Sequence, residues 1–184
     1  MPVLISMLRG VNLGPHNRIK MEALRALYES LKFEHPQSYV QSGNVIFRTK
    51  EKNTPQLAQK IQAAIAKKFR CSPDVILRTA DEIRKVIAAN PLAERAKEEP
   101  GKVLVTFLAA EPPKEAAANL ANLKGFPEEL HLKGRELYIY FPNGAGKSKL
   151  PWSSVDKLVK VTGTARNWNS VQAILKIAEE MESA

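Results

Sequence analysis

The sequence contains one cysteine, Cys71, among its 184 residues, so no internal disulfide can form. A chain without disulfides is typical of a reducing compartment, and we expect a cytoplasmic protein. No run of about 18 apolar residues is present, so no membrane-spanning helix is expected. Residues 1–12 have no basic lead and no small-residue cleavage site, which favours a strand over a signal peptide.

Side chains that build hydrolytic and metal sites are also scarce. The three histidines have no metal-ligand spacing among themselves or with Cys71. Only three aspartates are present, and Asp81 and Asp156 are expected in the first turns of helices. Neither paired carboxylates nor a Ser-His-Asp set can be identified, so the sequence predicts no metal, no cofactor and no particular reaction.

Charge is abundant but unevenly distributed. The net charge is +9 at pH 7. Residues 1–90 contain 15 Lys and Arg against 7 Asp and Glu, whereas residues 91–184 contain 13 against 12. A basic half indicates contact with phosphate groups, nucleic acid or another polyanion, and the alternative is a solvated basic surface.

Apolar periodicity predicts six elements in the first part of the chain. Short apolar runs of strand composition alternate with two segments whose apolar residues recur at helical spacing. The second helix is expected to begin with Thr54 as N-cap and Pro55 in the first helical position. This order of elements is that of a ferredoxin-like βαββαβ unit. The strands are expected at 3–9, 38–41, 44–49 and 74–79, and the helices at 20–33 and 54–69.

The same order of elements recurs after residue 101, without a visible repeat of the residues themselves. Between the two sets, Thr79 and Glu82 form a capping box that opens another helix, and residues 93–101 are polar and typical of a connection. The later strands are expected at 102–109, 129–132, 136–141 and 162–165, and the helices after 112, at 153–161 and after 170.

The sequence therefore predicts an α+β protein with two ferredoxin-like units in tandem plus a C-terminal helix. We expect a first unit at 1–79, a helix and linker at 80–101, and a second unit with the C-terminal helix at 102–184. Tyr138 and Tyr140 share one strand face, where packing against the other unit is expected rather than base stacking.

Two polar segments of the first unit, LRGVNLG at 8–14 and QSGNVIF at 41–47, are candidates for binding. Arg9 offers a planar fork for phosphate or carboxylate, and Asn12 can both donate and accept. The spacing does not match the GxGxxG dinucleotide fingerprint. A tight hairpin explains Gly43, whereas Gln41 and Asn44 stay candidates. The alternatives are an Arg–carboxylate pair and a satisfied turn.

A third polar segment, TARNWNS at 164–170, precedes the last helix. Asn167 or Asn169 can cap that helix, and its free N–H groups beside Arg166 are suited to an anion. The large ring of Trp168 is expected in the core. The alternative is a capped helix with an Arg–carboxylate pair.

The segment GAGKS at 144–148 is not a P-loop, because the first required glycine is missing and Pro151 interrupts the helix that should follow. A basic loop that holds an anion through Lys147, Ser148 and Lys149 is one interpretation. An exposed turn is the other.

Five ordered motifs carry a resemblance to a known family. The segments LRGVNLG, QSGNVIF, LRTADEI, GAGKSKL and TARNWNS are similar, in this order, to motifs of the mainly bacterial family catalogued as domain of unknown function 1697. Lys147 stands where Arg is common in that family, and Ser170 where Thr is common. The resemblance implies paired ferredoxin-like units and implies no catalytic residues.

Together these features predict a binding module for an anionic ligand, nucleic acid or a nucleotide, at the junction of the two units. An enzyme acting on a small phosphorylated or carboxylated substrate is one alternative. A structural or protein-interaction domain, with the polar motifs as an interdomain clasp, is another. No membrane partner is expected. The candidate binding residues are Arg9, Asn12, Gln41, Asn44, Arg78, Lys147, Ser148, Arg166, Asn167 and Asn169.

Overall fold

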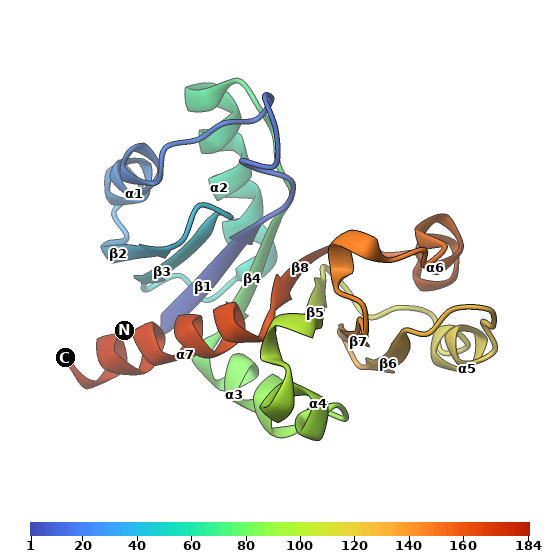
Figure 1. Cartoon of the computed structure of the whole chain (residues 1–184). Coiled ribbons are helices and arrows are strands. Elements are labelled where there is room, and N and C mark those ends of the chain that lie inside the picture. The colour runs from blue at the N-terminus through green and yellow to red at the C-terminus, as the bar shows by residue number, and fades with distance from the viewer. The chain divides into compact units, whose positions relative to one another are not determined.

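The computed structural model describes all 184 residues, which form eight strands, seven α-helices and two 3-10 helices (Figure 1). Contacts group the chain into two compact units, residues 1–85 with 172–184 and residues 86–171. The chain is thus an α+β protein, as the alternation of strand and helix patterns predicted. None of the helices has the length and apolar character needed to cross a bilayer.

The first unit contains a four-stranded antiparallel sheet in the order β2-β3-β1-β4. Side chains alternate between the faces of each strand, and one face packs on α1 and α2. The core there contains Leu4, Phe47, Leu24 and Ile61, with Tyr28 donating or accepting a 2.7 Å hydrogen bond with Ser6. The elements are β1 (Val3–Leu8), α1 (Met21–Ser30), β2 (Glu34–Tyr39), β3 (Asn44–Arg48), α2 (Thr54–Phe69) and β4 (Val75–Thr79).

The second unit repeats this plan with a sheet in the order β6-β7-β5-β8. Leu108 and Ile139 from the sheet and Phe141, directly after β7, pack with Val155 and Val159 of α6. The elements are β5 (Val103–Leu108), α5 (Ala116–Ala121), β6 (Glu129–Lys133), β7 (Glu136–Tyr140), η2 (Ala145–Lys147), α6 (Trp152–Val159) and β8 (Gly163–Asn167).

The two sheets match in register as well as in strand order. Ile5 on β1 lies opposite Arg78 on β4, and Val105 on β5 lies opposite Arg166 on β8. Both arginines thus occupy the same position on the sheet face away from the core helices. The prediction of tandem ferredoxin-like units is confirmed, and the duplication extends to a buried arginine that the sequence alone did not align.

Helix α3 (Ala80–Ala88) begins with the capping box predicted from the sequence. The Glu82 N–H donates to Thr79 Oγ1 at 3.1 Å, and the Thr79 N–H donates to Glu82 Oε2 at 2.8 Å. The expected start of α2 is off by one residue. Asn53, rather than Thr54, is the N-cap, since its side chain accepts the Gln56 N–H at 3.1 Å. Asn and Thr both cap well, so the composition did not distinguish them.

The segment at 93–101, expected as a polar connection, is ordered as α4 (Ala93–Glu98) and η1 (Pro100–Lys102). Its Ala, Glu, Arg and Lys residues are strong helix formers. Arg95 pairs with Glu129 at 2.9 Å and lies 4.6 Å from the centre of the Tyr140 ring, whose hydroxyl donates to Glu99. Tyr138 donates to the Val86 carbonyl at 2.7 Å. Both hydroxyls therefore bond to residues 86–99.

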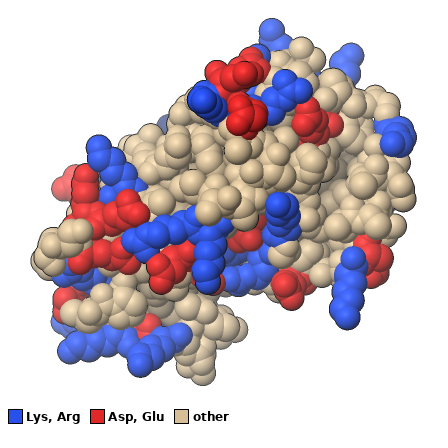
Figure 2. Space-filling view, turned by 90° about the horizontal axis from the view of Figure 1, so that it is seen from below, with Lys and Arg blue, Asp and Glu red and all other residues tan.

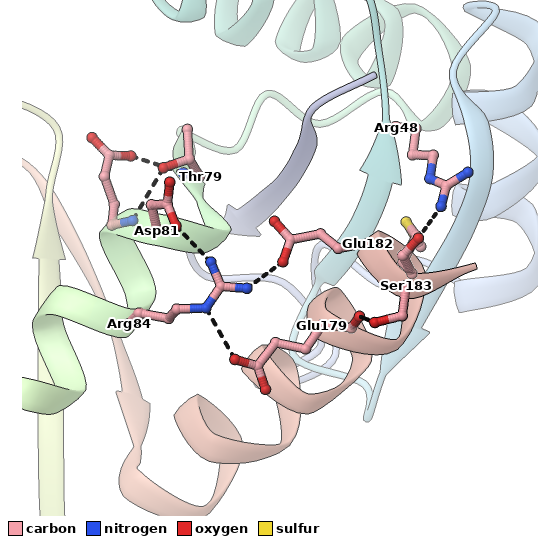
Figure 3. A network of polar contacts seen from close by, with 9 residues as sticks. Arg48, Thr79, Asp81, Arg84, Glu179, Glu182 and Ser183 are labelled. Carbon is pink, nitrogen blue, oxygen red and sulfur yellow. Dashed lines mark hydrogen bonds and ion pairs between the residues drawn. The ribbon is translucent and has the colours of Figure 1, made fainter.

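The last helix, α7 (Trp168–Ser183), contributes residues 172–184 to the first unit, whereas the sequence-based division places the whole helix with the second. Figure 3 shows the polar contacts that hold it there. Arg48 donates through Nη2 to the carbonyls of Met181 and Ala184. Arg84 of α3 bonds Glu182, Glu179 and Asp81, and these carboxylates raise its pKa. The buried residues of α7 are Trp168, Val171, Ile174, Ala178 and Met181.

Candidate functional site

Two of the three polar segments meet at one end of the first sheet. The chain leaves β1 into a loop at 9–20, and the turn at 40–43 joins β2 to β3; we call these residues the loop cluster. The Leu8 N–H donates to the Gly43 carbonyl and the Arg9 N–H to the Asp74 carbonyl, each at 3.0 Å. Backbone hydrogen bonds thus fix both segments at the strand ends.

The side chain of Asn12 fixes the loop through three hydrogen bonds. Its Nδ2 donates to the carbonyls of Ile19 at 2.9 Å and Gln41 at 2.7 Å, while its Oδ1 accepts the Ile19 N–H at 2.8 Å. Asn12 has φ +57°, a left-handed conformation that Asn tolerates better than most residues. The amide therefore shapes the loop, and its three bonds tie the loop to the neighbouring turn.

The turn at 40–43 is equally constrained. Gly43 has φ +83°, and a Cβ there would lie 2.8 Å from Leu8 Cβ and Val11 Cγ2, so no other residue fits. Val40 has φ +50°, which is strained for a β-branched side chain, and half of its side chain is exposed. Asn44 is buried and donates to the Tyr39 carbonyl at 3.1 Å and to Ser42 Oγ at 2.8 Å.

The side chains that this frame presents to solvent are mostly basic or apolar. Arg9 is half exposed and faces Asp74 at 3.9 Å, a long pair between two solvated groups. Arg18 donates only through Nε, to the Gly14 carbonyl at 3.1 Å. Leu13 is 83% exposed. Gln41 is exposed as well, and its backbone carbonyl accepts the hydrogen bond from Asn12. The sequence did not single out Arg18, although it lies in the same loop as Arg9.

Arg78 and Arg166 have a different setting, because they are 1% and 6% exposed on their strands. Each donates through Nη1 to the carbonyl of the preceding residue at 2.9 Å, and Arg166 also donates to Thr164 Oγ1 at 2.8 Å. Burial lowers the pKa of Arg166 to about 10, which still leaves it charged at pH 7. Both arginines therefore belong to the interior rather than to an open surface.

Of the two asparagines predicted as the N-cap of α7, Asn167 is the one that caps the helix. Asn167 Oδ1 accepts the Ser170 N–H at 2.8 Å, and Trp168 is buried as expected. Asn169 points to solvent. Thr79 performs the same role for α3, so each buried arginine is followed directly by a helix cap.

The loop at 144–150 is closed by a polar latch. Ser148 Oγ donates to Glu128 Oε1 at 2.6 Å and accepts the Leu150 N–H at 3.1 Å. Glu128 is only 9% exposed, and its Oε2 has no hydrogen-bond partner. Lys147 and Lys149 are exposed on the same loop. The serine thus orders the loop, while the lysines stay available to an anion.

No group of three or more His, Cys, Asp or Glu side chains is arranged to hold a metal ion. Basic side chains do not form a continuous patch on every face of the molecule. Figure 2 shows a face on which Lys and Arg alternate with Asp and Glu. Of the predicted candidates, the loop cluster contains Arg9, Asn12 and Gln41, and Asn44 follows it directly. The others lie elsewhere: Arg78 and Arg166 are buried on their strands, and Lys147, Ser148, Asn167 and Asn169 belong to other segments.

Comparison with known proteins agrees with this fold. The model of the family described as "Protein of unknown function (DUF1697)" matches residues 1–138. The chain belongs to this family. The solved structure of the conserved bacterial protein SP0830 from Streptococcus pneumoniae is 19% identical, covers 96% of this chain and 98% of its own, and superimposes with a TM-score of 0.73. At that identity the likeness shows the fold alone. A search among curated proteins gave no match.

Proposed function

We propose that this member of the family is a cytoplasmic binding module for an anionic ligand, a nucleic acid or a nucleotide, and that the loop cluster receives it. The observation that carries the proposal is the loop at 9–20, which the hydrogen bonds of Asn12 fix in place and which holds Arg9 and Arg18 at the surface. A guanidinium binds phosphate through parallel N–H donors, and a pre-organised loop loses little freedom on binding.

Both arginines are available for such a ligand. The 3.9 Å contact of Arg9 with Asp74 joins two half-exposed groups, and pairs of this kind contribute little. Arg18 uses only Nε within the loop, so its two terminal nitrogens can donate outward. The basic composition of residues 1–90 adds long-range attraction for a polyanion.

The backbone of the loop is also accessible. A Cβ placed at Gly10 or Gly14 would meet no atom within 4 Å, so the space above both glycines is open. A phosphate or a base can therefore approach the main chain there, and close approach is one reason why a loop contains glycine.

Fluorescence anisotropy of labelled single-stranded and duplex RNA and DNA tests the proposal. At low salt we expect dissociation constants of about 10⁻⁴–10⁻⁶ M, the range of non-specific phosphate binding. The double variant R9A/R18A should weaken binding by about tenfold or more, since charge-assisted hydrogen bonds contribute about 1.5–3 kcal/mol each. The variant K124A/K157A removes the same charge from exposed lysines of the second unit and is the matched control.

Two results would contradict the proposal. One is the absence of binding to every nucleic acid and nucleotide tested at low salt. The other is an equal loss of affinity in R9A/R18A and K124A/K157A, because that would trace binding to net charge and not to the loop cluster.

A further inference from the structure

A second surface of the first unit, which shares only Lys20 with the loop cluster and lies outside the sequence motifs, has the composition of a ligand site. An open groove of about 470 Å³ follows the solvent side of α1, and Lys68 from the last turn of α2 closes its other wall. We call it the α1 groove. Its volume is in the range of small-molecule sites. It is lined by Lys20, Glu22, Ala23, Ala26, Leu27, Ser30 and Lys68.

The floor of the groove is apolar although it lies on the outer side of the helix. Met21, Leu24 and Tyr28 already fill the core with the opposite face of α1. The outer face of such a helix is usually charged. Here Ala23 and Ala26 lie beside Leu27, whose side chain also packs partly against the core, and together they leave a stripe of small and apolar side chains against which a hydrocarbon chain can lie.

The rim adds two lysines that form no ion pair. Lys20 and Lys68 are exposed and take part in none of the ion pairs of the structure. Lys20 also occupies the N-cap of α1 and supplies no side-chain cap, so the positive end of the helix faces the same rim. Glu22 is the one carboxylate there. Two lysines against one glutamate suit a single anionic head group better than a polyanion.

We propose that the α1 groove binds a free alkyl carboxylate, a single-chain anionic amphiphile. The chain lies along Ala23, Ala26 and Leu27, and the carboxylate meets the ammonium groups of Lys20 and Lys68. A bilayer is the less suitable source of the same chemistry. The groove is concave, and two lysines provide less attraction than the larger basic clusters that bind anionic membranes.

Titration of the full chain with octanoate, decanoate and dodecanoate, each below its micelle concentration, tests this site. Each added methylene should tighten binding about fourfold until the groove is filled. Decanol should bind about tenfold more weakly than decanoate, because it lacks the charge-assisted contact. Equal affinities across the chain series, or no binding by any of them, would overturn the proposal. So would binding to anionic vesicles alone.

Matched variants locate the site. Ala26→Trp fills the groove and should abolish carboxylate binding, whereas Ala63→Trp, on the exposed side of α2, should leave it unchanged. Lys68→Glu should weaken binding strongly and its neighbour Lys67→Glu should not; equal effects of the two would overturn the assignment. R9A/R18A should retain carboxylate binding, so this inference and the proposed function can fail separately.

Discussion

Asn12, Asn44 and Asn167 each use the side-chain amide in hydrogen bonds to the protein's own backbone. Their types and positions could be predicted to matter from the sequence, because Asn at strand and helix ends is typical of turns and caps. The choice between binding and structural bonding could not be predicted, since it depends on where carbonyls such as that of Gln41 lie in space.

Replacement of Asn12 by Ala should lower the free energy of unfolding by about 1–3 kcal/mol. The change removes three hydrogen bonds and leaves Ala at φ +57°. Urea unfolding followed by circular dichroism measures the effect. Asn169→Ala, on a solvent-facing side chain, is the control and should stay within about 0.5 kcal/mol of the parent chain. If Asn12→Ala lowered the free energy of unfolding no more than Asn169→Ala does, the hydrogen bonds of Asn12 would not be what fixes the loop.

Arg166→Ala should destabilise the chain by about 2–4 kcal/mol. Its guanidinium is buried and donates to Thr164 Oγ1 and to the Ala165 carbonyl, so truncation leaves acceptors without donors and a cavity. Thermal unfolding of the two proteins in the same buffer provides the measurement. An unchanged melting temperature would show that the residue is not an interior one.

Glu99 makes a pH-dependent contribution to the free energy of unfolding. Hydrogen bonds from Lys102 and then from Tyr140 lower its pKa below the usual 4.5. Below that value the unfolded chain binds more protons than the folded chain, so this contribution is present at neutral pH and is lost as the pH falls through the folded pKa. Glu99→Gln should therefore lose less stability than the parent between neutral and acidic pH. Parallel curves of unfolding free energy against pH would contradict this.

At the scale of elements, the strands and helices follow from apolar periodicity, and most expected elements are found near their expected bounds. The exception is the segment at 93–101. AERAKE is polar but consists of strong helix formers, and it forms α4, where Arg95 and the following Glu99 bond to Glu129 on β6 and Tyr140 on β7. Such long-range pairing has no signal in the sequence.

Helix α7 should be held mainly by its buried stripe. Ile174 is 1% exposed, so Ile174→Ala should lower the unfolding free energy by about 2–5 kcal/mol. The double variant Glu179→Gln/Glu182→Gln removes two partners of Arg84 at the surface. Its smaller loss of melting temperature should vanish near 1 M salt, where ions screen such pairs. A loss that exceeds that of Ile174→Ala, or that persists at high salt, would reverse this ranking.

At the scale of the whole molecule, the tandem plan and the charge imbalance were both accessible from the sequence. The position of the charge was not. Arg78 and Arg166 are buried and do not offer their guanidinium groups to a ligand at the surface. The loop cluster exposes the predicted Arg9 and, in addition, Arg18. The account therefore depends on a local basic surface, and net charge alone does not provide it.

The slope of log K against log salt concentration tests this claim most directly. Each phosphate contact contributes about 0.9 to the slope for duplex DNA and about 0.7 for single strands. We predict that R9A/R18A reduces the slope by nearly two such contacts, while K124A/K157A leaves it unchanged. An identical slope for the parent chain and R9A/R18A would show that the loop cluster does not contact phosphate, and would contradict the proposed function.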